Sequence, residues 1–441
     1  MQYLSFLLAS VLLCTVSLPQ FSGAGTRKLL AGFILAFIVI SLINLFAKLL
    51  INQSIKSFFS QLKIRKIDLA ILLIALSAFI STISSYFFHE SLVGFAKYIL
   101  YFLFYICICS IANSKSLCKG LILALLIGLL WSNIEGLRQA FWGAEALATW
   151  EDPNVHFSKQ LNRVYSNFLN PNLYGAYLIS LWPFSLFFIP HLMSQKNKTN
   201  IQKLLSSFGI ILSTVLAIIS IYLILQTGSR GAWLSLSAQL LIAGIAILIF
   251  VKSKIVSVGF WGTAVISSLY FVSKPSFFNR VLSIFSSYEH SSNSFRLNVW
   301  KACGQMFADN PLFGIGPGSE SFYQAYGIYS DSIHSSLGAY SLPIEIAVEM
   351  GLFGVISFLF FIFTIFISGI ETLKRFTKID SLKQSEDLVL ILIGLISLTG
   401  LLINGLFDIV ILRPQIQIVL WTIVAIVRFS TNNTKVKLNN D

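Results

Sequence analysis

Long apolar runs fill most of this sequence, and they constrain its fold more than any other feature. Many of the runs exceed the ~18 residues that mark a helix able to cross a lipid bilayer. Only 11% of the residues are charged, compared with roughly 25% in a typical soluble protein. Because so few charged residues cannot cover the surface of a soluble chain of 441 residues, the sequence predicts an all-α polytopic membrane protein.

The runs predict about 12 transmembrane helices, each near the length that crosses ~30 Å of hydrocarbon. The sequence contains no flexible linker, low-complexity tract or internal repeat, so residues 1–441 are expected to form a single membrane domain. The expected helices lie roughly at residues 1–20, 29–50, 67–88, 92–112, 117–141, 173–190, 204–225, 233–251, 255–272, 342–370, 388–407 and 409–427.

The distribution of Lys and Arg predicts the orientation of the chain. The formal net charge is +13, which on a soluble domain would suggest nucleic-acid binding. In membrane proteins, however, basic residues gather in short cytoplasmic loops. Placing the N-terminus in the cytoplasm puts most Lys and Arg in short inner loops and the long polar segments outside. We therefore expect cytoplasmic termini, a large periplasmic loop at residues 274–340, contact with the lipid bilayer and no nucleic-acid partner.

Residues 274–340 form the longest polar interruption, and we expect them to contain short helices. Ser294 can cap a helix that runs to Asp309, where Asn310-Pro311 stops it. We expect the apolar side of this helix to lie on the membrane surface. The segment Gly314–Gly318 follows no strand and contains a proline, so it predicts a tight turn that returns the loop toward the membrane rather than a nucleotide-binding loop.

Arginines in the outer segments are candidate ligands for an anion. Arg230 is the clearest, because it sits in a short turn between two apolar runs, with a glycine close on either side and the Ser229 hydroxyl next to it. A guanidinium fork at a membrane edge suits phosphate or carboxylate recognition. Arg296 is a second candidate, on the predicted loop helix. For Arg163 and Arg280, each taken alone, contact with lipid head groups is the favoured interpretation.

Three carboxylates lie near the predicted outer face. Glu345 and Glu349 are one helical turn apart where a spanning helix begins, and Asp408 lies between the last two apolar runs. Carboxylates at such positions are costly unless they are paired or face water. We expect the outer arginines, including Arg413, to be their partners, either as structural ion pairs or around a polar cavity.

Histidine and cysteine residues give no sign of a metal site. The five histidines and five cysteines form no pair with metal-ligand spacing, so the sequence predicts neither a metal nor a cofactor. His334 is the histidine nearest in sequence to the carboxylates, which makes it a candidate general base.

Several short motifs occur in order along residues 163–414. They are Arg163 with Asn170-Pro-Asn172, Thr227-Gly-Ser-Arg-Gly-Ala-Trp233, Arg296 with Val299-Trp300, Asp309–Gly318, and Glu345–Gly351. Their order and spacing resemble the O-antigen ligase and polymerase-like membrane family, with residues 163–414 as its core. Thr149–Pro153, Ala339–Pro343 and Phe407–Pro414 further resemble its cyanobacterial IctB branch, whose members are named as bicarbonate transporters.

The resemblance implies a bacterial inner-membrane protein with many helices and a large outer loop. It implies that Arg230 and Arg296 hold the diphosphate of a polyprenyl-linked glycan, and that a loop histidine acts as base toward the acceptor hydroxyl. Tyr340 stands where the resemblance places that histidine. Tyr340, whose ordinary pKa is ~10, and the nearby His334 are therefore the two candidate catalytic residues.

Three functions fit these observations. The first is an IctB-type bicarbonate transporter with an outward-facing anion site formed by Arg163, Ser229, Arg230 and Arg296. The alternative is a metal-independent glycosyltransferase that ligates or polymerises a glycan carried on a polyprenyl diphosphate. The third is a non-catalytic protein that binds a lipid-linked glycan. All three predict a cationic site on the outer face, and they differ in the size of the ligand and in the need for a base.

Overall fold

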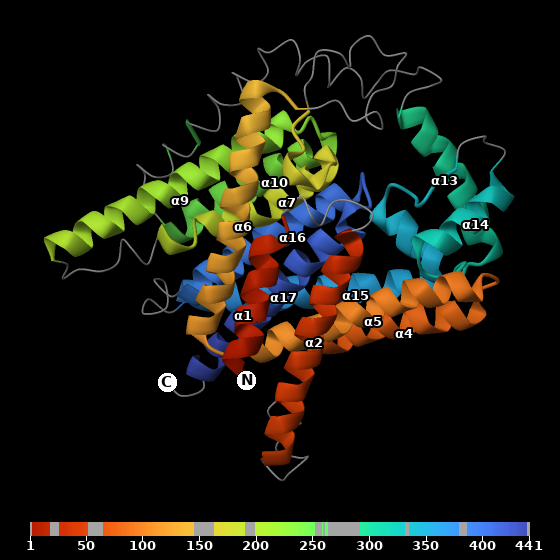
Figure 1. The fold of residues 1–441 in the computed structure, drawn as a ribbon, viewed down its shortest axis with the longest axis horizontal. Coiled ribbons are helices and arrows are strands. Elements are labelled where there is room, and N and C mark those ends of the chain that lie inside the picture. Colours follow the sequence, from red (N-terminus) through yellow and green to blue (C-terminus); the bar gives the residue numbers. More distant parts are fainter. Residues whose placement is uncertain are drawn as a thin grey trace.

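The structure, a computed structural model, describes residues 2–17, 26–51, 65–144, 163–189, 199–251, 258, 261–262, 292–330, 335–378 and 386–438. Within these ranges the regular structure is entirely helical (Figure 1). The α-helices are α1 (Gln2–Thr15), α2 (Thr26–Ile51), α4 (Lys66–Ser84), α5 (Phe88–Ile111), α6 (Lys115–Trp142), α7 (Pro171–Ser185), α9 (Asn200–Gln226), α10 (Arg230–Ala246), α13 (Ser292–Asp309), α14 (Ser319–Tyr329), α15 (Leu342–Lys378), α16 (Glu386–Gly405) and α17 (Pro414–Leu438). Short helical turns are η3 (Ser166–Phe168), η4 (Ile247–Val251) and η6 (Val410–Leu412).

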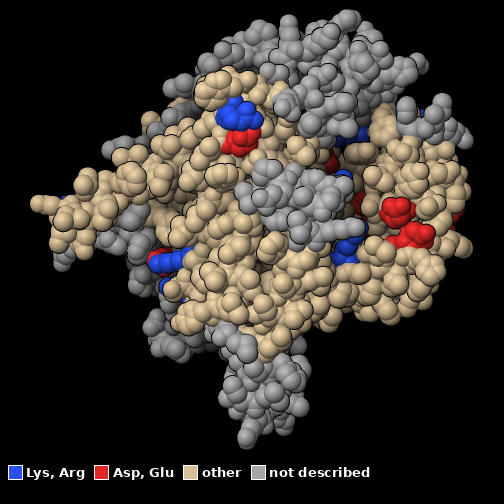
Figure 2. Space-filling view, viewed as in Figure 1, with Lys and Arg blue, Asp and Glu red and all other residues tan. Residues whose placement is uncertain are grey.

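The all-helical part of the predicted fold class is confirmed for the described residues, and the large periplasmic loop remains a prediction. Eleven of the twelve predicted apolar runs carry a helix, and the remaining run, 255–272, falls almost wholly outside the described residues. Eight of the described helices are long and apolar enough to cross a membrane, namely α4, α5, α6, α9, the α10–η4 unit, α15, α16 and α17. Figure 2 shows one face of the molecule, on which the charged side chains of the described residues occupy only a few small patches. The count of about 12 spans remains a prediction.

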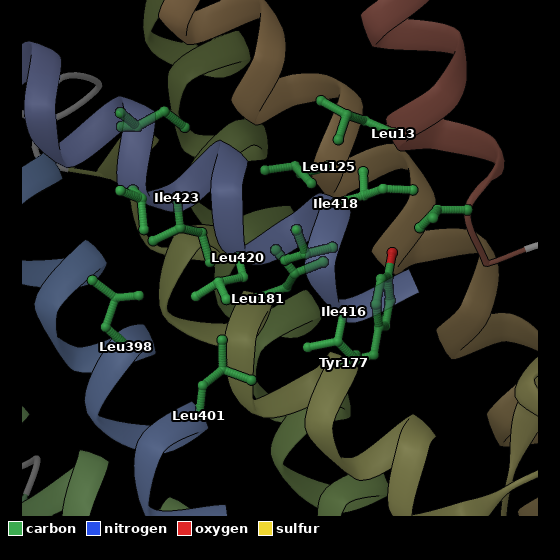
Figure 3. Close-up of a cluster of buried hydrophobic side chains, with 14 of the residues drawn as sticks. Leu13, Leu125, Tyr177, Leu181, Leu398, Leu401, Ile416, Ile418, Leu420 and Ile423 are labelled. Atoms are coloured by element: carbon green, nitrogen blue, oxygen red, sulfur yellow. The ribbon is translucent and has the colours of Figure 1, made fainter. Parts of the chain in front are cut away.

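Helix α7 forms the centre of the bundle. All of its residues except Asn172 are buried, against α6, α9, α10, α16 and α17. Figure 3 shows Tyr177 and Leu181 of α7 among apolar side chains of α16 and α17. Gln239 of α10 adds polar links here, since its amide group bonds to the Trp182 indole at 2.7 Å and to the Ile396 carbonyl oxygen at 3.0 Å. These contacts fix α7, and therefore the segment that precedes it.

The helix ends form two groups with different chemistry. At one end, which we call the site end, lie the turn 227–229 and the segments 163–170, 338–341 and 406–413. At the other end, ion pairs join neighbouring helices: Lys119 to Glu386 at 2.7 Å and Arg428 to Asp68 at 2.7 Å. Helices α13 and α14 lie side by side at the site end, across the bundle from both termini (Figure 1).

Helix α15 is broken at Gly351, where φ is 63° and ψ is −159°. The segment 311–316 supplies the backbone hydrogen bonds that the break removes. The Ile315 amide donates to the Val348 carbonyl at 2.9 Å, and the Leu352 amide donates to the Pro311 carbonyl at 2.8 Å. Because buried backbone groups must be paired, this loop segment and the broken helix stabilise each other.

The chain bends at the predicted turn Gly314–Gly318, and its surroundings explain its glycines. Gly316 has a φ of +108°, and a Cβ atom there would collide with the Ser85 and Ser91 hydroxyls at the junction of α4 and α5. Gly318 lies against Gly94 of α5, with a Cβ position 2.9 Å from the Gly94 Cα. The turn therefore docks directly onto the α4–α5 hairpin.

The predicted loop helix is confirmed as α13, but the environment expected for its apolar side is wrong. Val299, Ala302 and Met306 are fully or almost fully buried in a small core that α14 and the start of α15 complete. Protein therefore covers this face of α13, and the membrane surface does not. The helices α13 and α14 instead form a cap over the site end.

We expect Gly316→Ala to lower the free energy of unfolding by roughly 2–4 kcal/mol, because the new Cβ combines a steric clash with an unfavourable positive φ. Thermal unfolding of the purified protein in detergent measures the effect. Gly304→Ala in α13 is the matched control, since a Cβ there meets nothing within 4 Å. Equal midpoints for the two variants would contradict the docking of the turn.

Candidate functional site

Asp408 is the carboxylate around which the candidate site is built. Its Oδ2 accepts a hydrogen bond from the Asn172 side-chain amide at 2.8 Å, and its Oδ1 accepts one from the Ile409 backbone amide at 2.7 Å. The Arg296 guanidinium lies 4.0 Å from Oδ2. Burial raises the pKa of Asp408 above its usual range, while the nearby positive charges of Arg296 and Arg413 oppose that rise.

Arg163 connects this carboxylate to the turn at residues 227–229. Its Nε donates to the Thr227 carbonyl at 2.9 Å, and its second guanidinium nitrogen donates to the Asn172 side-chain oxygen at 2.8 Å. Gly228, with φ +61°, lets the turn pass close to the arginine, since a Cβ there would be 3.4 Å from Arg163 Nε. Arg163 therefore holds the turn in place as well as contributing positive charge.

Arg230 and Ser229 begin helix α10 at this turn. Ser229 is the N-cap, and its hydroxyl accepts a hydrogen bond from the Ala232 amide at 3.4 Å. Gly231 packs closely on the end of α16, so the half-buried Arg230 lies beside the segment that leads to Asp408. The N-terminus of a helix carries partial positive charge, which adds to that of the arginine.

Arg296 faces an aromatic ring as well as a carboxylate. Its guanidinium carbon lies 5.7 Å from the centroid of the Tyr340 ring, and the Phe295 ring meets Tyr340 edge-on at 5.7 Å. Such a cation–π contact orients a guanidinium without neutralising it. The side chain of Arg296 retains 22% of its exposure, so it is accessible to a ligand.

The peptide that precedes Tyr340 is held from two sides. The Trp300 indole donates to the Ala339 carbonyl at 2.8 Å, and the Glu345 carboxylate accepts from the Ala339 amide. Tyr340 itself has a φ of +54°, which is uncommon for a residue other than glycine. Left-handed backbone of this kind persists where the surroundings determine it, and α13 and α15 supply those surroundings here.

Glu345 and Glu349 form no ion pair with an arginine of the described residues, contrary to our expectation, although Arg413 lies near enough to Glu345 to interact with its charge. Both carboxylates are only 2% exposed, and each accepts a hydrogen bond from a backbone amide. Glu349 accepts from Gly318 at 2.7 Å and from the Tyr98 hydroxyl at 3.3 Å. These bonds tie the segment 338–341 and the start of α14 to α15. Of the three predicted carboxylates, Asp408 is the one within ion-pair distance of an arginine in the described residues.

The structure also bears on the candidate bases. Burial raises the pKa of Tyr340 above its ordinary value, so its hydroxyl stays protonated at neutral pH and accepts a proton poorly. His334 and Arg280 lie outside the described residues, and their roles remain predictions. Within the ranges that the structure describes, no group of three or more His, Cys, Asp or Glu residues could hold a metal ion.

Two residues of the site were not assigned a role from the sequence. Asn172 joins Arg163 to Asp408, and Trp300 fixes the peptide before Tyr340. The motif that contains Asn172 was recognisable in the sequence. The partners of its side chain were not recognisable, because Asp408, for example, lies more than two hundred residues away.

Comparison with known proteins identifies part of the chain. Residues 215–359 match the sequence model of the O-antigen ligase family. This segment contains Arg230, Arg296, Tyr340 and Glu345. No curated protein matches the chain. The match and the eight helices of spanning length together define an integral membrane protein with an O-antigen ligase-like domain.

We expect Trp300→Phe to lower the free energy of unfolding by about 1–3 kcal/mol, because it leaves the buried Ala339 carbonyl without its donor. Thermal unfolding measures the change. Trp131→Phe is the matched control, since Trp131 is 53% exposed on α6. If both variants unfold at the wild-type temperature, the indole does not hold this peptide.

Proposed function

We propose that this chain transfers a glycan from a polyprenyl-diphosphate carrier to an acceptor hydroxyl at the site end. The observation that carries the proposal is the network in which Arg163, Asn172, Asp408 and Arg296 converge from three separate parts of the chain. The match of residues 215–359 to the O-antigen ligase family supports a lipid-linked glycan as the substrate class.

Arg296 and Arg230 are proposed to bind the diphosphate. Guanidinium groups bind phosphate oxygens with two parallel hydrogen bonds, and Arg230 acts together with the N-terminus of α10. The Tyr340 ring and Asp408 set the direction of the Arg296 guanidinium. Positive charge that is fixed before the reaction stabilises the negative charge that develops on a leaving diphosphate.

The proposed reaction is a substitution at the anomeric carbon of the carried glycan. The oxygen of the acceptor hydroxyl forms a bond to that carbon, and the bond from the carbon to the diphosphate oxygen breaks. Polyprenyl diphosphate leaves with the bonding electron pair, and the hydroxyl proton passes to a base. Because Tyr340 is protonated at neutral pH, His334 is the predicted proton acceptor.

The positions of basic residues support an orientation. The end opposite the site carries Lys115, Lys119, Lys374, Arg375 and Arg428, which is the pattern of a cytoplasmic surface. We therefore propose that the site end faces the periplasm of a bacterial inner membrane. Lipid-linked glycans would reach the site from the outer leaflet.

Bicarbonate transport, which the IctB resemblance implies, is the competing hypothesis. The family match gives it no support, whereas a lipid-linked glycan agrees with that match. Proteoliposomes can test both hypotheses with the same preparation. One assay follows labelled bicarbonate uptake, and the other follows transfer from an undecaprenyl-diphosphate-linked glycan.

We expect Arg296→Ala to lower kcat/KM for transfer by roughly 10²–10³-fold, as the loss of a positioned charge does in other active sites. Arg296→Lys keeps the charge but loses the planar fork, so an intermediate loss of about tenfold is expected. Transfer from the lipid-linked glycan measures both variants. Arg138→Ala is the control, because Arg138 is exposed and paired with Glu135. Wild-type rates in Arg296→Ala would exclude the proposed diphosphate site.

We expect Tyr340→Phe to retain transfer within about threefold of wild type, since it keeps the ring that faces Arg296 and removes only a hydroxyl. Loss of a general base would instead lower the rate by roughly 10²–10⁴-fold. Tyr340→Ala, which removes the ring, should lose much more activity. A large loss in Tyr340→Phe alone would restore the tyrosine as the base.

A further inference from the structure

The motif Asn170-Pro171-Asn172 contains one residue whose side chain takes no part in starting helix α7. Asn170 is the N-cap of α7, and its side-chain oxygen accepts from the amides of Asn172 and Leu173 at 2.8 and 3.1 Å. Pro171 occupies the first helical position, where the missing amide costs nothing. These two residues account for the start of the helix. The Asn172 side chain takes no part in the N-cap of α7 and points into the candidate site instead.

The Asn172 carboxamide is fixed at both ends. Its oxygen accepts from Arg163 at 2.8 Å, and its nitrogen donates to Asp408 at 2.8 Å. An arginine can only donate and an ionised carboxylate can only accept, so these neighbours define which atom of the amide is which. Both neighbours are themselves anchored, Arg163 on the Thr227 carbonyl and Asp408 on the Ile409 amide.

We propose that Asn172 is a positioning residue that holds Asp408 in the place from which it directs the Arg296 guanidinium. This inference rests on the proposed function, because Arg296 is the group that meets the diphosphate. The separation of 4.0 Å between Asp408 and Arg296 is that of a loose ion pair, which does not fix its own geometry. The two shorter hydrogen bonds to Asp408 supply that geometry.

No other side chain of similar size can replace this amide. An aspartate at position 172 would still accept from Arg163, but it would place a second carboxylate against Asp408. An apolar residue would leave both Arg163 and Asp408 short of one partner in a partly buried site. Neither change removes an arginine, so the binding of an anion should depend on Asn172 less than the reaction rate does.

The experiment uses the full-length protein in nanodiscs and four variants: Asn172→Ala, Asn172→Asp, the exchange variant Asn172→Asp with Asp408→Asn, and Asn172→Ala with Arg296→Ala. The exchange variant keeps one carboxylate and one amide but moves the carboxylate from position 408 to position 172. Asn113→Asp, on an exposed residue outside the site, is the control. The measurements are kcat and KM for transfer, binding of undecaprenyl diphosphate, and the midpoint of thermal unfolding.

For Asn172→Ala we expect kcat to fall by about tenfold or more, while the dissociation constant for undecaprenyl diphosphate changes by less than about threefold. Asn172→Asp should lower both kcat and the unfolding midpoint. The exchange variant should regain the midpoint, because donor and acceptor match again, but not kcat, because the carboxylate no longer lies opposite Arg296. A residue with a merely structural role would not separate kcat from stability in this way.

Two results would overturn the proposal. One is wild-type kcat in Asn172→Ala, and the other is recovery of kcat in the exchange variant. A double-mutant cycle measured by thermal unfolding gives a test that needs no substrate. The changes in unfolding midpoint caused by Asn172→Ala and Arg296→Ala should not add in the double variant. Additive changes would refute the link between the two residues even in a protein that transfers nothing. A different result would reject only the proposed function. In it, the wild type neither transfers a glycan nor binds the diphosphate, while the changes in unfolding midpoint are still non-additive.

Discussion

The cost of burying a carboxylate determines how the site end is built. A buried charge is tolerated only when hydrogen bonds or an opposite charge compensate for the lost water. Glu345, Glu349 and Asp408 are each compensated, but in different ways. The two glutamates accept from backbone amides of Ala339 and Gly318, which join the cap to α15. Asp408 instead accepts from Asn172 and lies 4.0 Å from Arg296, so it couples the scaffold to a cationic group.

The backbone and side-chain bonds at the site end explain why the cap can hold the Arg296 guanidinium in a fixed position. The break in α15 at Gly351 exposes backbone groups that the segment 311–316 satisfies, so this segment cannot shift without losing several hydrogen bonds. The same cap carries α13 and its Arg296. Trp300, one turn further along α13, then fixes the Ala339 carbonyl and so places the Tyr340 ring against Arg296. Backbone pairing in the membrane helix thus determines a side-chain position in the site.

The sequence predicted the parts of this arrangement that depend on length and local pattern. Apolar runs located the helices, and the turn residues located the start of α10 and the docked turn at Gly314–Gly318. It did not predict partners that are distant in the chain. We expected Glu345 and Glu349 to pair with arginines, because their backbone partners, 6 and 31 residues away in the loop, cannot be recognised from spacing alone. For the same reason we expected the apolar face of α13 to lie on the membrane surface, whereas α14 and α15 cover it.

Under the proposed function, the ligand must match guanidinium groups that come from different segments. Arg163 reaches Asp408 through Asn172, Arg296 lies 4.0 Å from Asp408, and Arg230 begins α10 at the adjoining turn. A diphosphate carries several charges and enough oxygen atoms to meet guanidinium groups from different segments at once. The proposal therefore requires accurate placement of the residues that orient Arg296, and not of the arginine alone.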